Sequence, residues 1–155
     1  MRRSTLSTLT LACLLAWTAA PGPAAAQPTE RVRVASRYDF STTLTRLEQA
    51  VAANRLGVVT RANAQNGARS LGVAISGNQV WGLFAPPYAV RMLKASVEAG
   101  FEAPVRLYIV EAADGRVTVS YIKPSVVFAP YRNAELDAMA RELDGKFERI
   151  VAAIR

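Results

Sequence analysis

Three tyrosines are the side chains in this sequence best suited to hold a ligand. Tyr88, Tyr121 and Tyr131 each join an apolar ring to a polar hydroxyl, and each lies at the end of an apolar segment. A buried hydroxyl beside a cation can bind an anion or, with a lowered pKa, transfer a proton. Two cations, Arg61 and Lys123, and the amide of Asn63 lie at the ends of predicted strands and are added to these tyrosines as candidates. The candidate ligand-binding residues are Arg61, Asn63, Tyr88, Tyr121, Lys123 and Tyr131.

The residue types that are missing exclude several kinds of chemistry. The chain has no histidine and a single cysteine, Cys13. No imidazole can therefore act as a general base, and no cysteine pair can form a disulfide or a zinc site. The sequence also lacks the glycine-rich loops that bind nucleotide phosphates and the acidic loop that binds calcium. We expect no metal and no cofactor.

Catalytic motifs are weak. Ser120 and Lys123 match the S-x-x-K pattern, but they end a predicted strand, where they point to opposite faces instead of stacking on one helix turn. The carboxylates of the last helix alternate with basic residues, which is typical of a solvated face. We assign no catalytic residue. An enzyme that uses Tyr121 with Lys123 or a nearby arginine stays as an alternative hypothesis.

The first 26 residues have the pattern of a signal peptide. Arg2 and Arg3 precede the uncharged apolar run 6–20, and small residues follow up to Ala26. Cleavage after Ala26 would remove Cys13 and leave 129 residues with 17 basic and 12 acidic side chains, a net charge of +5. The sequence therefore predicts export to the periplasm or the extracellular space, by the general or the twin-arginine route, with no transmembrane segment in the mature chain.

The positive charge indicates the kind of partner. Arg31, Arg33 and Arg37 alternate with apolar residues, so they share one face of the predicted first strand. Because an exported protein does not meet the chromosome, we expect no nucleic-acid partner. Charge attraction to an anionic membrane or a cell-envelope polymer is a further alternative for the function.

The first half of the mature chain predicts alternating strands and helices. Residues 27–35 form a polar leader and the start of a strand that runs over 31–38. Asp39 and Ser41 are capping residues for a helix that Gly57 ends as the residue after its C-cap. The segments that follow are a strand over 58–62, a short helix capped by Asn63, a loop over 72–78 and a strand over 79–84.

The second half predicts two helices around a hairpin. Pro86 and Pro87 begin a helix whose apolar stripe is Val90, Leu93 and Val97, and Gly100 ends it. Strands over 105–111 and 117–121 are joined by the turn at 114–115. A loop covers 124–131. The long C-terminal helix is capped by Asn133 and has an apolar stripe at Leu136, Met139, Leu143, Phe147, Ile150 and Ile154.

This order of elements predicts one compact α+β domain over 36–155, with helices packed on a largely antiparallel sheet. Gly82, inside a predicted strand, indicates a bulge or a close approach of another part of the backbone. Aromatic residues cluster at two junctions, around Trp81 to Tyr88 and around Tyr121 to Tyr131. If these junctions meet, they line a small pocket or a dimer surface.

Two blocks of the sequence resemble the family known as domain of unknown function 302. The segment 36–50 reads S-R-Y-D-F followed by T-L-T-R-L-E-Q-A, and 114–124 reads D-G-R-V-T-V-S-Y-I-K-P. Leu83 to Pro86 and the pair Ala103-Pro104 match weaker blocks between them. The resemblance implies a compact α+β fold and no established activity, and it leaves a homodimer open.

This chain departs from the family pattern at three polar positions. Asn63-Ala64 stands where relatives carry Asp-His, Phe84-Ala85 replaces Gly-Asn, and Ile122-Lys123 replaces Asn-Asp. If those residues form the family's site, this copy keeps Tyr121 and little else. The leading hypothesis is therefore an exported, non-enzymatic domain that binds a small ligand or an envelope partner, or acts as an accessory subunit.

Overall fold

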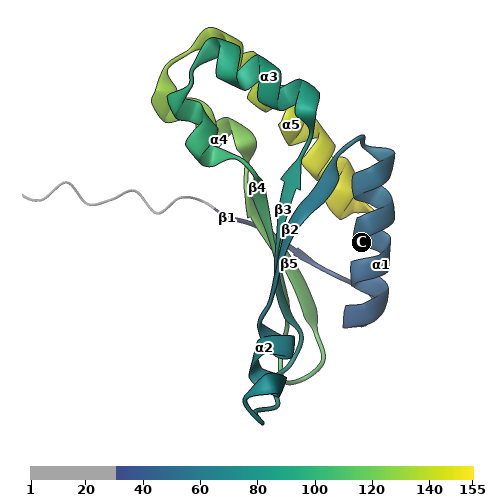
Figure 1. The fold of residues 1–155 in the computed structure, drawn as a ribbon. Helices are drawn as coiled ribbons and strands as arrows, with labels where there is room; N and C mark the ends of the chain where they lie inside the picture. The colour runs from purple at the N-terminus through teal and green to yellow at the C-terminus, as the bar shows by residue number, and fades with distance from the viewer. Residues whose placement is uncertain (1–30) are drawn as a thin grey trace, which may run out of the picture.

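The computed structural model describes residues 31–155, and its centre is one five-stranded sheet (Figure 1). The predicted signal peptide and residues 27–30 of the leader lie outside the described residues. Every neighbouring pair of strands is antiparallel. In spatial order the strands are β1 (Arg31–Ala35), β5 (Val117–Ile122), β4 (Val105–Glu111), β3 (Asn78–Phe84) and β2 (Gly57–Asn63). The α+β prediction is confirmed.

Helices cover the two faces of the sheet unequally. Figure 1 shows α1 (Phe40–Ala53) and α5 (Ala134–Ala152) on one side of the sheet. The helices α3 (Pro86–Ala95) and α4 (Pro124–Phe128) lie at the upper end of the sheet, where both contact α5, and the rest of the other side is less covered. A short helix, α2 (Ala64–Ser70), closes the arm that β2 and β3 form at the opposite end, and it has no buried residue.

The core lies between the covered face of the sheet and α5. Trp81, Leu107, Ile109 and Val119 are fully buried on that face. They meet the stripe of α5, whose six predicted residues are all buried, so this prediction is confirmed. Alternation along each strand leaves the next residue on the opposite, less covered face.

Asp39, Asn63 and Asn133 have their predicted capping roles, whereas Ser41 lies inside α1 and donates a hydrogen bond to the Asp39 carboxylate at 2.9 Å. The Asp39 carboxylate accepts a hydrogen bond from the Thr42 amide at 2.8 Å and begins α1. Asn63 caps α2, and Asn133 caps α5 by accepting from two backbone amides. Gly115 lies at φ +82° in the turn between β4 and β5, the conformation that favours glycine there.

The predicted end of α1 is wrong. The helix ends at Ala53, and Arg55 takes the left-handed conformation at φ 57°. Gly57 instead begins β2. Glycine adopts the left-handed conformation most readily, and the sequence therefore predicts that conformation at Gly57. Here Arg55 adopts it, and Leu56 is then buried.

The predicted end of α3 is also wrong, and its apolar stripe is exposed. Its side chains Val90 and Leu93 are 53% and 46% exposed, and Val97 beyond the helix is 75% exposed. The buried side of α3 carries Met92, and this side packs on α5. The helix ends at Ala95, and a separate 3₁₀ turn, η1 (Glu98–Glu102), follows it.

The segment predicted as a loop over 124–131 is helical. Pro124 is in the first turn of α4, which places Phe128 in the core at 1% exposure. The 3₁₀ turn η2 (Ala129–Tyr131) continues it. Both turns are too short to show a helical repeat in the sequence.

Candidate functional site

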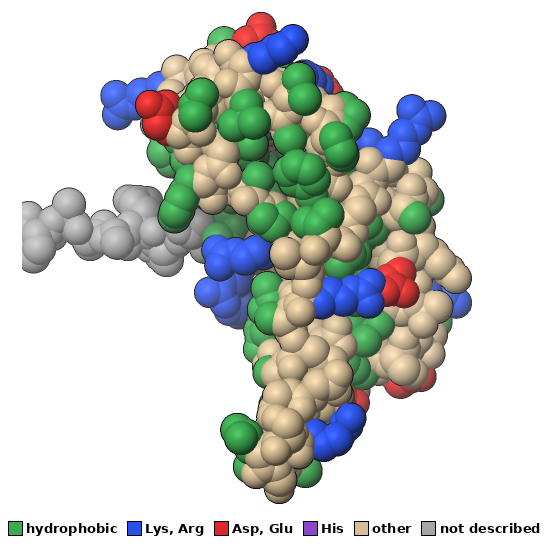
Figure 2. All heavy atoms as spheres, in the orientation of Figure 1, with side chains coloured by type: hydrophobic (Ala, Val, Ile, Leu, Met, Phe, Trp, Pro, Cys, Tyr) green, Lys and Arg blue, Asp and Glu red, His purple; other side chains and the backbone are tan. Residues whose placement is uncertain are grey.

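A cavity of about 350 Å³ lies on the less covered face of the sheet. Its floor comes from β3, β4 and β5, and its upper wall from α4 and the segment between η1 and β4. That volume is at the low end for pockets that hold small molecules. In Figure 2 a hollow opens below the apolar upper part of the molecule, and basic side chains lie beside it.

Two arginines border this cavity. Arg31 comes from β1 and Arg106 from β4, and both are exposed. Neither forms an ion pair with any other residue in the range 31–155. The carboxylate at the rim, Glu102, instead accepts a hydrogen bond from the Tyr131 hydroxyl at 3.1 Å. The cavity therefore presents two cations that an anionic ligand can reach.

The remaining lining is mostly apolar, with three residues that carry a hydroxyl group, Tyr108, Ser120 and Tyr121. Tyr108 and Ser120 lie opposite each other on neighbouring strands. The Tyr108 oxygen already accepts a hydrogen bond from the Asn78 amide at 2.8 Å. The apolar walls are Val80, Pro104, Val105, Ile122 and Val127. An amphipathic anion, with a charged head and a short apolar body, fits this combination of groups.

The shape of the wall depends on Gly82. A methyl group built on its Cα would lie 2.3 Å from the Thr60 hydroxyl and 2.6 Å from the Pro104 ring. Gly82 therefore lets Pro104 pack directly on the sheet, where it lines the cavity. The groups that approach Gly82 are side chains and not another part of the backbone, and the strand irregularity lies opposite it, between Val58 and Thr60 of β2.

Of the predicted site residues, Tyr121 lies at this cavity and Tyr131 lies beside it. Tyr121 lines it, although its ring also packs on Phe147 in the core, with ring centroids 5.2 Å apart. Burial and the carboxylates of Glu148 and Asp144 raise the pKa of Tyr121. Such a hydroxyl stays protonated at neutral pH, which disfavours proton transfer by it. Tyr131 reaches the rim through Glu102, and burial and this hydrogen bond also raise its pKa.

The structure does not bring the other four candidates to this cavity. Lys123 lies 3.4 Å from Glu148 of α5. Arg61 forms an ion pair with Glu48 and stacks over the Trp81 ring, with its guanidinium carbon 4.7 Å from the centroid. Asn63 caps α2.

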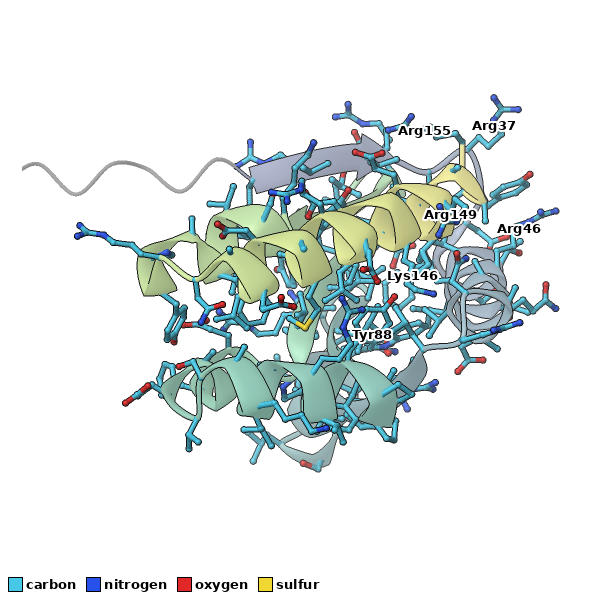
Figure 3. The ribbon with its side chains drawn as sticks, turned by 90° about the horizontal axis from the view of Figure 1, so that it is seen from above. Arg37, Arg46, Tyr88, Lys146, Arg149 and Arg155 are labelled. Carbon is cyan, nitrogen blue, oxygen red and sulfur yellow. The ribbon has the colours of Figure 1, made fainter. Side chains whose placement is uncertain are left out.

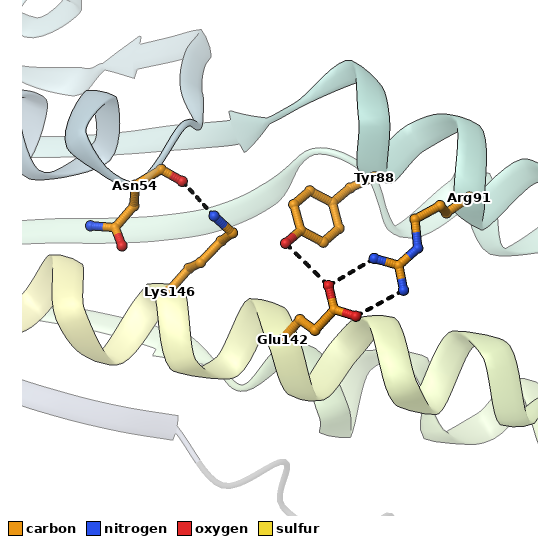
Figure 4. Close-up of polar contacts among 5 residues, drawn as sticks. All are labelled: Asn54, Tyr88, Arg91, Glu142 and Lys146. Atoms are coloured by element: carbon orange, nitrogen blue, oxygen red, sulfur yellow. Dashed lines mark hydrogen bonds and ion pairs between the residues drawn. The ribbon is translucent and has the colours of Figure 1, made fainter.

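The fourth of these candidates, Tyr88, helps to hold α3 on α5. Its hydroxyl lies 3.4 Å from the Glu142 carboxylate, which also accepts two hydrogen bonds from Arg91 at 2.7 and 2.9 Å (Figure 4). Burial, followed by the charge of Glu142, raises the pKa of Tyr88. The Arg91 hydrogen bonds lower the pKa of Glu142. This cluster explains Tyr88 as a structural contact.

The aromatic junctions meet in the core. Phe84 and Tyr88 lie beside Phe128 around a void of only about 30 Å³. A void of that size has room for about one water molecule. The pocket that the sequence predicted between the junctions is therefore filled by side chains.

A second basic surface follows the line where α1 meets α5. Figure 3 shows Arg37 and Arg155 at one end, then Arg46 and Arg149, and then Lys146 beside Tyr88. Lys146 donates to the Asn54 carbonyl at 2.7 Å, and Arg149 donates to the Asn54 side chain at 2.8 Å. These bonds place cations at the C-terminus of α1, where the helix dipole favours them.

Three residues of the cavity, Arg106, Tyr108 and Glu102, are not among the site residues predicted from the sequence. The signal for the first two was present, because they alternate with buried residues along β4 in the same way as Arg31 and Arg33 do along β1. Once β1 is paired with β5 and β5 with β4, Arg31, Arg106 and Tyr108 lie on one face of the sheet. No sequence pattern indicated that α4 and η1 would enclose the upper part of that face.

The described residues hold no group of three or more side chains that suit a metal ion. None of their helices combines the length and the apolar character that crossing a bilayer requires. Asn63 and Phe84, two positions that the family resemblance singled out, lie far apart in the sheet. Asn63 pairs with Gln79, whereas Phe84 pairs with Gly57 at the opposite end of the β2–β3 ladder.

Comparisons with known proteins agree on one family. No curated protein matches the chain. Among solved structures, an uncharacterized conserved DUF302 protein from Bacillus stearothermophilus has a similar fold, with a TM-score of 0.72 at 17% sequence identity. The match covers 81% of this chain and 98% of that one. The family model for the domain of unknown function DUF302 matches residues 32–154, so the chain belongs to this family.

Proposed function

We propose that this domain binds a small amphipathic anion in the cavity on the less covered face of its sheet. The observation that supports this proposal is a cavity of about 350 Å³ with apolar walls and two arginines that lack a carboxylate partner among residues 31–155. An arginine binds a carboxylate or a phosphate through charge-assisted hydrogen bonds. The proposed location is outside the cytoplasm, as the N-terminal sequence predicts.

The test compares ligands that differ only in their head group. Butanoate, octanoate and decanoate, each beside the alcohol of the same chain length, are titrated into the purified protein and followed by the melting temperature and by calorimetry. A hydrogen bond to a charged group contributes about 1.5–3 kcal/mol, so a carboxylate should bind at least about tenfold more tightly than its alcohol. A ligand at 100 times its Kd adds about 2.7 kcal/mol of stability.

Two variants separate this site from general charge attraction. Arg106→Gln should weaken carboxylate binding at least about tenfold. Arg69→Gln removes the same charge from α2, on the arm, and should leave binding unchanged. If no carboxylate binds, if the alcohols bind equally well, or if both variants weaken binding equally, the proposal is wrong.

A second candidate function is attachment to an anionic polymer of the cell envelope. Along the α1–α5 line, five cations have no carboxylate partner among the described residues: Arg37, Arg46, Lys146, Arg149 and Arg155. None of the exposed large apolar side chains lies on α1 or α5. Such a surface favours a chain of anionic groups over insertion into a bilayer.

Binding to inorganic polyphosphate at increasing salt tests this candidate. The affinity of the protein for polyphosphate should fall steeply as the salt concentration rises, because salt screens exposed charges. The double variant Arg37→Gln/Arg46→Gln should bind more weakly than Arg69→Gln/Arg132→Gln, which removes the same charge elsewhere. Equal affinities of the two double variants would exclude the α1–α5 line as the binding surface.

A further inference from the structure

The apolar side chains that face outward from α3 and η1 form one continuous stripe. Val90, Leu93, Val97 and Phe101 follow one another at spacings of 3, 4 and 4 residues, and Phe101 is 87% exposed. The stripe continues across the break between α3 and η1, because Leu93 lies against Gly100, 3.1 Å from the position of a Cβ there. Figure 2 shows apolar side chains gathered over this part of the molecule. We name these four residues the α3–η1 stripe.

No contact within the described chain accounts for these four side chains. Their helix already packs on α5 through its opposite side, where Met92 is buried. The stripe exposes on the order of 500 Å² of apolar surface, which is the size of the largest apolar patch on an ordinary monomer and often marks a binding site. We propose that it binds a second copy of this chain.

The charges beside the stripe favour a second copy over a lipid surface. The α3 half carries the basic Arg91 and Lys94, and the η1 half carries the acidic Glu98 and Glu102. An antiparallel, two-fold arrangement sets the basic half of each stripe beside the acidic half of the other. An anionic membrane would attract one half and repel the other.

Lys94 and Glu98 are the two groups that can form new ion pairs in this dimer. Lys94 has no ion-pair partner among residues 31–155, and the Glu98 carboxylate accepts only a hydrogen bond from the Ser96 hydroxyl at 2.9 Å. By symmetry the dimer contains two Lys94–Glu98 pairs. Such exposed pairs add little affinity, but they fix the relative orientation of the partners.

The buried area is sufficient for a specific dimer. Two stripes that cover each other remove about 1,000 Å² of surface from water, which is the lower limit for a specific interface. The contact is isologous, so the same patch serves both copies and the assembly closes at two. We therefore expect a reversible dimer and no larger oligomer.

Sedimentation of the purified protein over a range of concentrations tests this inference. The wild-type chain should shift from monomer to dimer as its concentration rises. Val97→Gln/Phe101→Gln should stay monomeric with an unchanged melting temperature, because both side chains are exposed in the monomer. The control, Leu71→Gln/Val73→Gln, removes two apolar side chains that are 81% and 53% exposed on the arm, and it should dimerise like the wild type.

A charge exchange tests the orientation. Lys94→Glu alone should weaken the dimer, because it sets like charges together, and Lys94→Glu/Glu98→Lys should restore it. A wild-type protein that stays monomeric at millimolar concentration overturns the inference, as does a Val97→Gln/Phe101→Gln protein that still dimerises. Flotation of a monomeric wild type with vesicles of anionic lipid, lost in Val97→Gln/Phe101→Gln, would assign the stripe to a membrane instead.

Discussion

Replacing Gly82 by alanine tests the packing that shapes the proposed binding cavity. Gly82 lies in the middle of β3, between the strands that carry Thr60 and Arg106. An added Cβ would lie 2.3 Å from the Thr60 hydroxyl, 2.6 Å from Cγ of Pro104 and 3.1 Å from its Cβ. The Thr60 side chain can rotate away, but the Pro104 ring is fixed to its backbone. The segment before β4 must therefore move outward.

The size of the effect follows from this contact. Forcing an extra carbon into a packed site costs about 1–3 kcal/mol. In a domain of this size, 1 kcal/mol lowers the melting temperature by roughly 4 °C, so Gly82→Ala should melt roughly 4–12 °C below the wild type. Because Pro104 lines the cavity, the same variant should also bind the anionic ligand more weakly.

Thermal unfolding followed by circular dichroism measures this difference, and Gly67→Ala is the matched control. Gly67 lies in α2, where a Cβ would meet nothing within 4 Å. Alanine there should raise stability by about 0.5–1 kcal/mol, because glycine is unfavourable within a helix. Adding Thr60→Ala to Gly82→Ala should recover only part of the loss, since the Pro104 contact remains. If Gly82→Ala melts at the wild-type temperature, the contact between β3 and Pro104 is not as tight as described.

Three further predictions concern helix ends. Asn133→Ala should cost about 1 kcal/mol in urea unfolding, because the amides of Glu135 and Leu136 lose their acceptor. Arg55→Gly should leave stability equal or higher, since glycine adopts the left-handed conformation without strain, and Gly57→Ala should not lower it. Hydrogen bonds from Thr42 and Ser41 lower the pKa of Asp39, so its capping contribution is present above its ordinary pKa of 3.8 and is lost as the pH falls through the lower folded value. Unfolding at pH 5 and pH 2.5 should therefore show a larger loss for the wild type than for Asp39→Asn, whose amide caps at both pH values.

Local signals predicted most of the fold because each has a local physical cause. Asp39 and Asn133 begin helices by accepting bonds from amides two or three residues ahead, whatever the rest of the chain does. Gly115 takes a conformation that favours glycine in a two-strand turn. The end of α1 was predicted wrongly, because a left-handed arginine requires the burial of Leu56, which is a contact between distant segments.

The candidate site was harder to predict, because its residues come together only through strand order. β1 pairs with β5 at the far end of the chain, which brings Arg31 to the same face as Arg106. The polar hydroxyl of a tyrosine did not by itself identify the residues of the cavity. Tyr88 makes a structural contact with Glu142, and only Tyr121 and Tyr131 lie at or beside the cavity.

The two apolar stripes of this sequence show what periodicity can and cannot establish. Leu136, Met139 and Leu143 on α5 and Val90 and Leu93 on α3 recur at the same helical spacing, so spacing alone does not distinguish the two stripes. The α5 stripe meets the sheet, because α5 lies along the covered face. The α3 stripe faces outward, because α3 uses its opposite side to pack on α5. A periodic apolar stripe predicts that a surface is covered, but not by which chain, and for α3 the second copy that we propose supplies that cover.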